Sequence, residues 1–133
     1  MVNMERDEIV RYWIESSDDD YRVMQSLSEN GHYVWALFVS HLVIEKLLKA
    51  CHVKNVDAHY PRIHNLVEIA AKATLELSTE QRVFLAELST VNLRARYPDY
   101  KNRFQKKATR QFAESQISKV KEFRQWLPEK INS

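Results

Sequence analysis

The stretch HYVWALFVSHLVIEKLLKACHV, residues 32–53, decides the fold. When its residues are advanced about 100° each around a helix, apolar side chains occur at almost every angle. A helix that is apolar all round is buried, either at the centre of a bundle or between subunits. Four of its polar residues instead fall within one stripe about 80° wide: His41, Glu45, Lys49 and His52.

This polar stripe has two interpretations, because charged groups on an apolar helix must be paired, hydrated or in use. In the first, Glu45 pairs with Lys49 and accepts a hydrogen bond from His41, and the stripe is the solvent edge of the helix. In the second, the stripe lines a functional groove or a subunit interface. The sequence leaves both open.

Working outward, periodicity and helix-ending signals predict an all-α fold, an up-and-down bundle of four long helices plus one short helix. Asn30-Gly31 ends the first helix, Ser78-x-x-Gln81 matches a capping box, and Pro98 and Pro128 end the last two long helices. The expected helices cover residues 5–28, 32–53, 64–74, 78–97 and 105–127. We expect residues 1–133 to form a single domain.

Composition agrees with this fold class. With 44% hydrophobic and 29% charged residues the chain is neither disordered nor a membrane span, and its single Gly and three Pro disfavour closely spaced hairpins. The lone Cys51 cannot form an intramolecular disulfide or a cysteine zinc site. No signal peptide is evident, so we expect a cytoplasmic protein with no membrane association.

Charge is distributed unevenly along the chain. Residues 1–30 hold eight acidic and three basic side chains, a net charge of −5, whereas residues 94–110 hold seven basic and one acidic, a net charge of +6. The basic segment could dock internally, meet a symmetry mate or bind phosphates, and it could also be a simple solvated face.

Four motifs in order resemble the HEPN domain family. They are Tyr33-x-x-Ala36-x-Phe38, Glu45-Lys46-x-x-Lys49-Ala50, Pro61-x-x-His64-x-Leu66 and Arg96-Tyr97-Pro98-Asp99, and the resemblance covers about residues 15–125. It implies a compact helical bundle, commonly a homodimer, in small prokaryotic proteins often encoded beside a minimal nucleotidyltransferase. Many members look like ribonucleases of toxin modules.

The family's ribonuclease signature is an Arg followed, after four to six residues, by a His. Here no His stands at that spacing after any Arg: Asp99, Tyr100 and Lys101 occupy those positions after Arg94, and Lys101, Asn102 and Arg103 occupy them after Arg96. Cleavage by that route would lack its acid–base group. The chain resembles the branch with Arg-Tyr-Pro-Asp in that position, and we expect a ribonuclease-inactive binding module with no catalytic residue, cofactor or metal.

For this module we expect a homodimer that binds nucleotide or RNA and has a possible nucleotidyltransferase partner. Arg96 would contact phosphate, Tyr97 could stack on a base or support the turn, and Asp99 could accept from Arg96. Arg94 is about 160° from Arg96 around the helix, so both cannot line one small site. The remaining candidate ligand contacts are Lys49, Glu45, His41 and His64, and the expected basic patch is Lys101, Arg103, Lys106, Lys107 and Arg110.

Other functions remain open. The protein could be an active ribonuclease toxin that uses a site without histidine. His64 could meet Glu45 or His41 as an acid–base pair, or all three could hold a metal, although they lack the HExxH pattern. Alternatively, the protein could be a scaffold that acts through an apolar surface. The candidates for that surface are Trp13, Trp35 and Trp126.

Overall fold

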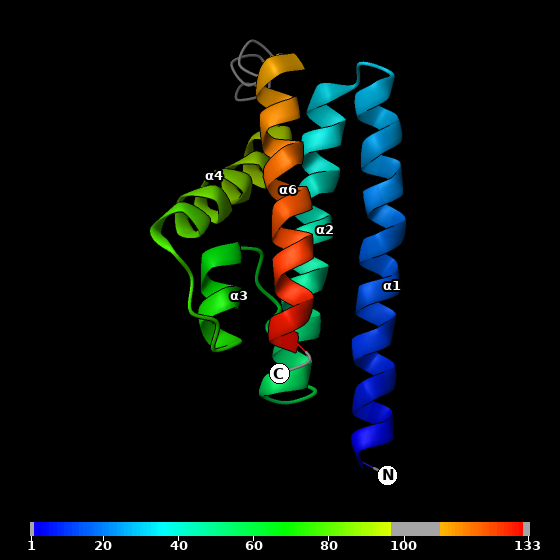
Figure 1. Ribbon diagram of the computed structural model, residues 1–133, viewed down its shortest axis with the longest axis vertical. Coiled ribbons are helices and arrows are strands. Elements are labelled where there is room, and N and C mark those ends of the chain that lie inside the picture. The colour runs from blue at the N-terminus through cyan, green and yellow to red at the C-terminus, as the bar shows by residue number, and fades with distance from the viewer. Residues whose placement is uncertain (1, 97–109, 132–133) are drawn as a thin grey trace.

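The computed structural model describes the backbone of residues 2–96 and 110–131 and the side chains of residues 5–91 and 110–128. These residues form five helices and, within the described ranges, no strand, so the predicted all-α fold is confirmed (Figure 1). The helices are α1 (Val2–Glu29), α2 (Tyr33–Asn55), α3 (Leu66–Lys72), α4 (Thr79–Arg96) and α6 (Arg110–Ile131).

Helix α2 lies at the centre of the fold. It packs against every other described helix, as its all-round apolar surface predicts. Figure 1 shows α1, α2 and α6 running along the long axis, with α4 inclined across them and α3 beside α2. The turn between α1 and α2 falls at the predicted Asn30-Gly31, where Gly31 has a φ of 79° that a side chain would disfavour.

Local signals explain most helix ends. The Ser78–Gln81 capping box forms as predicted: the Gln81 amide donates to Ser78 Oγ at 3.1 Å, and the Ser78 amide donates to Gln81 Oε1 at 2.9 Å. Helix α3 starts at Leu66, two residues later than His64, because Asn65 is its cap and accepts from the Glu68 amide at 3.1 Å.

The predicted end of the last helix at Pro128 is wrong. Helix α6 continues through Pro128 to Ile131. Proline removes one backbone donor, its ring crowds the carbonyl four residues earlier, and it disfavours the helical conformation in the residue before it. So close to the C-terminal end of a helix, this leaves a single carbonyl without its partner, and the helix survives.

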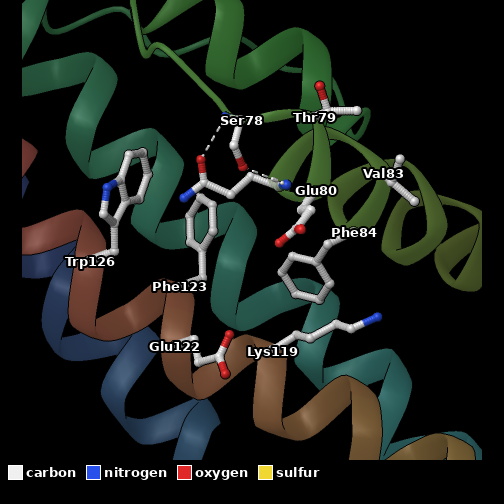
Figure 2. Close-up of a pocket in the computed structure, with 10 residues that line it drawn as sticks. Ser78, Thr79, Glu80, Val83, Phe84, Lys119, Glu122, Phe123 and Trp126 are labelled. Carbon is white, nitrogen blue, oxygen red and sulfur yellow. Dashed lines mark hydrogen bonds between the residues drawn. The ribbon is translucent and has the colours of Figure 1, made fainter.

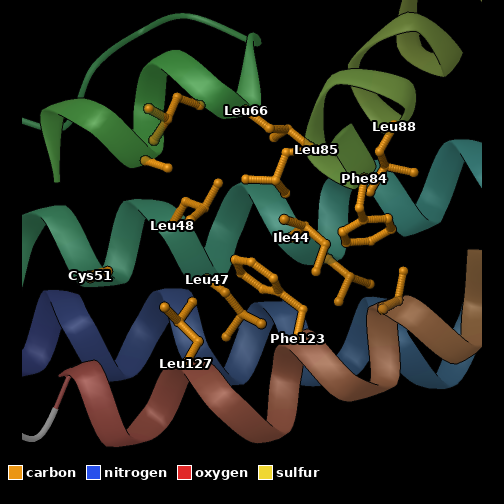
Figure 3. Close-up of a cluster of buried hydrophobic side chains, with 14 of the residues drawn as sticks. Ile44, Leu47, Leu48, Cys51, Leu66, Phe84, Leu85, Leu88, Phe123 and Leu127 are labelled. Carbon is orange, nitrogen blue, oxygen red and sulfur yellow. The ribbon is translucent and has the colours of Figure 1, made fainter. Parts of the chain in front are cut away.

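A contiguous apolar core joins all five helices around α2 (Figure 3). Ile44 and Leu48 of α2 are fully buried, and Leu66, Leu85 and Leu127 pack around them from α3, α4 and α6. In such a core, truncating one leucine to alanine costs about 2–5 kcal/mol. The core therefore fixes the position of α2 and, with it, of the polar stripe.

No helix in the described part of the chain is both long and apolar enough to cross a membrane.

Candidate functional site

The polar stripe of α2 is buried, so its interpretation as a solvent edge is wrong. His41, Glu45, Lys49 and His52 are between 1% and 7% exposed. Trp13 of α1 and the connecting segment, residues 56–65 between α2 and α3, contribute side chains that contact the stripe. The charges must then be satisfied by protein groups.

Glu45 is the centre of these contacts. Its Oε1 accepts from His64 Nδ1 at 2.6 Å, and its Oε2 lies 3.6 Å from Lys49 Nζ. The Glu45 side chain is only 7% exposed, whereas that of His64 is 57% exposed. The pair therefore joins a buried carboxylate to an imidazole at the surface. The predicted pairing of Glu45 with Lys49 and the predicted meeting of His64 with Glu45 both occur.

His41 holds the same segment through its backbone. Its Nε2 lies 3.0 Å from the carbonyl oxygen of His64, so Nε2 carries the proton and donates. The ring nitrogens His41 Nε2 and His64 Nδ1 are thus both engaged by protein oxygens. Within the described residues no three His, Cys, Asp or Glu side chains are placed to hold a metal ion.

Two aromatic rings complete the surroundings of Lys49. Its Nζ lies 5.5 Å from the ring centre of Trp13 and 5.2 Å from that of Tyr60, and the two rings meet edge to face with centres 5.0 Å apart. Cation–π contacts of this kind stabilise a buried ammonium group. Sequence reasoning missed Tyr60 as a partner of the stripe, because the helical period relates residues within one helix and says nothing of a connecting segment.

The exposed side of His64 faces a hollow between α3 and α4. The hollow has a volume of about 660 Å³, and its polar lining residues include His64, Asn65, Glu68, Ser89 and Thr90. Ser89 Oγ accepts the Leu66 amide hydrogen at 2.9 Å, so α4 holds the start of α3 in place. A polar ligand reaching this hollow would meet an imidazole, hydroxyl groups and one carboxylate.

A second groove, of about 560 Å³, lies between the start of α4 and α6 (Figure 2). Phe84, Phe123 and Trp126 give it an apolar floor, and Glu80, Lys119 and Glu122 stand among them. Figure 2 shows the Ser78 cap at one end of this groove, where it is engaged in its own helix. Among the candidate ligand residues whose side chains the structure describes, none lines this groove.

Part of the predicted ligand site lies at the far end of α4. Arg94 and Arg96 belong to its last turns by backbone position. Six further candidates lie outside the described residues: Tyr97, Asp99, Lys101, Arg103, Lys106 and Lys107. Arg110 is described; it is exposed at the start of α6, and a hydrogen bond of 2.8 Å to Glu114 raises its pKa.

Two buried groups of α2 are held in uncharged forms. Burial raises the pKa of the Cys51 thiol to about 11. Burial is also the main cause that lowers the pKa of His52, against the opposing effect of Asp57. Neither group reaches either cavity, and Asn55 Nδ2 donates to Cys51 Sγ at 3.3 Å. Both are therefore structural parts of α2.

The described residues thus form a helical bundle whose central helix carries a buried polar stripe, and Glu45 of this stripe is bonded to the exposed His64. The HEPN domain family matches residues 10–131, and the chain belongs to this family. No curated protein matches the sequence. Among solved structures, the crystal structure of TT1696 from Thermus thermophilus is similar, with a TM-score of 0.77 and 21% identity. The similarity covers 91% of this chain and 97% of that one, and at this identity it shows the fold alone.

Proposed function

We propose that this protein is a dimeric nucleotide- or RNA-binding module that acts with a minimal nucleotidyltransferase partner in a toxin–antitoxin-like system. The observation that carries the proposal is its membership of the HEPN family over residues 10–131. That family commonly forms homodimers, and its members are often encoded beside such a partner. Cytoplasmic location and prokaryotic origin follow from the same proposal.

The basic segment supplies the attraction for a polyanion. Between residues 94 and 110 the net charge is +6, and each Lys or Arg that neutralises a phosphate releases a counterion. Binding should therefore weaken steeply as salt rises. In this proposal Arg96 and Tyr97 contact phosphate and base, and Asp99 accepts from Arg96.

We do not propose RNA cleavage by the family's route, because the histidine that would serve as its acid–base group is missing. No histidine follows Arg94 or Arg96 at the spacing of four to six intervening residues. The histidine that lines the hollow between α3 and α4, His64, comes instead from the connecting segment and is bonded to Glu45.

Dimerisation is supported by an apolar surface on the first turns of α2. Trp35 is 50% exposed there, and its ring meets that of Phe38 with centres 6.1 Å apart. Tryptophan is enriched at the centres of protein interfaces, where the partner covers side chains that are exposed in the free subunit. In the dimer we propose, this surface is covered by the second copy.

The test is a titration of short single-stranded RNA into the purified protein at low and moderate salt, with the RNA from the same tubes run on a gel. We expect salt-dependent binding without cleavage, and weaker binding by Arg96→Ala. Cleavage that disappears in Arg96→Ala would refute the inactive assignment, and absence of binding at low salt would refute the RNA-binding role.

A further inference from the structure

We propose that the hollow between α3 and α4 binds a phosphodiester group of an RNA strand, and that His64 is the contact whose protonation controls affinity. This inference rests on the proposed function, because it names the ligand group and the place where that same binding occurs. It is carried by the geometry of His64, Glu45 and the hollow.

One nitrogen of the His64 ring is fixed and the other is available. Nδ1 is held by Glu45 at 2.6 Å, and Nε2 makes no hydrogen bond within the described part of the chain. A second bond, from His41 to the carbonyl oxygen of His64, fixes the backbone of the same residue at 3.0 Å. The imidazole is therefore held in one orientation at the edge of the hollow, which lowers the entropy cost of engaging a ligand.

Protonation adds a positive charge to this fixed ring. Within the buried cluster Glu45 and Lys49 offset each other, so a protonated His64 leaves a net charge of +1. His64 is also the exposed member of the three. When protonated, its Nε2–H becomes a charge-assisted donor toward the hollow, the kind of group that binds phosphate oxygens.

The other groups around His64 set the balance of charge. From α2 they are Glu45, Lys49 and the buried His41, from α3 Glu68, and from α4 the uncharged Ser89 and Thr90. Glu68 is the one carboxylate among the described residues that line the hollow. It opposes an anion there, so binding depends on His64 being charged. Removing the charge of Glu68 should therefore strengthen binding, whereas removing His64 should weaken it.

The experiment measures the affinity of a short oligouridylate at about pH 5.5 and 7.5, an interval over which an ordinary imidazole titrates and a phosphodiester keeps its charge. Wild-type protein should bind up to about tenfold more tightly at the lower pH, because a protonated ring donates a charge-assisted hydrogen bond to the phosphodiester. His64→Ala should lose most of this ratio. His59→Ala, which changes an exposed histidine of the same segment, should keep it.

One further variant tests the sign of the charge effect. Glu68→Gln should bind more tightly at both pH values. Uridine, which has no phosphate, should show no pH-dependent binding. Thermal melting of each variant checks that it remains folded.

The outcomes separate the two proposals. An unchanged pH ratio in folded His64→Ala, or pH-dependent uridine binding, would overturn the His64 site while leaving RNA binding intact. Absence of RNA binding by wild-type protein at both pH values would instead remove the proposed function, and the site with it.

Discussion

Replacing Glu45 by alanine should be among the most destabilising single changes in this protein. The substitution leaves the Lys49 ammonium without its carboxylate at a position where its side chain is 9% exposed, and it also frees His64. Breaking a buried ion pair by removing one partner costs about 3–5 kcal/mol, because the remaining charge is uncompensated. The Trp13 and Tyr60 rings offset only part of this cost.

Chemical and thermal unfolding provide the assay. For a chain of 133 residues, about 4 °C of Tm corresponds to each kcal/mol, so Glu45→Ala should lower Tm by about 12–20 °C. Asp19→Ala is the matched control, because it breaks an ion pair with Arg22 in which both side chains are about 70% exposed. Exposed pairs contribute about 0–1 kcal/mol, and the control should stay within that range.

A double variant separates charge from packing. Glu45→Met with Lys49→Met removes both charges and keeps side-chain volume, so it should recover most of the stability lost in Glu45→Ala. The reasoning would be refuted by a Glu45→Ala variant as stable as Asp19→Ala. It would also be refuted by a double variant that loses as much as Glu45→Ala, because the uncompensated Lys49 charge could then not be the cause of the loss.

Three further predictions concern other groups. Because burial lowers the pKa of His52 in the folded chain, its contribution to stability is present above its ordinary pKa of 6.5 and is lost as pH falls through the folded value; His52→Gln should flatten this acid-side loss in urea unfolding, and an unchanged slope would contradict it. The Cys51 thiol, with a pKa of about 11 and no exposure, should react with a thiol reagent only at the rate of unfolding, and rapid labelling of folded protein would be inconsistent with its burial. Trp35→Ala should shift the dimer toward monomer in light scattering at equal concentration, whereas Val83→Ala, at an equally exposed position, should leave the dimer intact.

The fold was largely predictable because its strongest signals are local. An apolar surface all round residues 32–53 predicts a central helix, and α2 does contact every other described helix. The Asn30-Gly31 turn and the Ser78 cap also act within a few residues of chain. The error at Pro128 has the same origin: the breaking rule holds for a helix interior and overstates the effect near the end of α6.

The candidate site was predictable only in part. The angular arithmetic correctly grouped His41, Glu45 and Lys49, because these residues share one helix. It could not say what covers them, since Trp13 and Tyr60 are 47 positions apart in sequence and meet only through the path of the connecting segment. Residue type suggested that His64 could meet Glu45, and only the fold supplied the distance of 2.6 Å.

The burial of the stripe changes what these residues can do for a ligand. Glu45, Lys49 and His41 cannot touch one without displacing the connecting segment, whereas His64 can, because the same contacts that bury its partners hold its ring at the surface. Burying a polar group of an apolar helix costs desolvation free energy, and its contacts within the protein must offset that cost. Here the contacts of Glu45 with Lys49 and His64 offset that cost, and they also fix one imidazole beside the hollow. Replacing Glu45 should therefore change both stability and binding, whereas replacing His64 should change mainly binding. His64→Ala should therefore lower affinity at acidic pH with a far smaller loss of Tm than Glu45→Ala, and equal losses of Tm would show that His64 serves the fold alone.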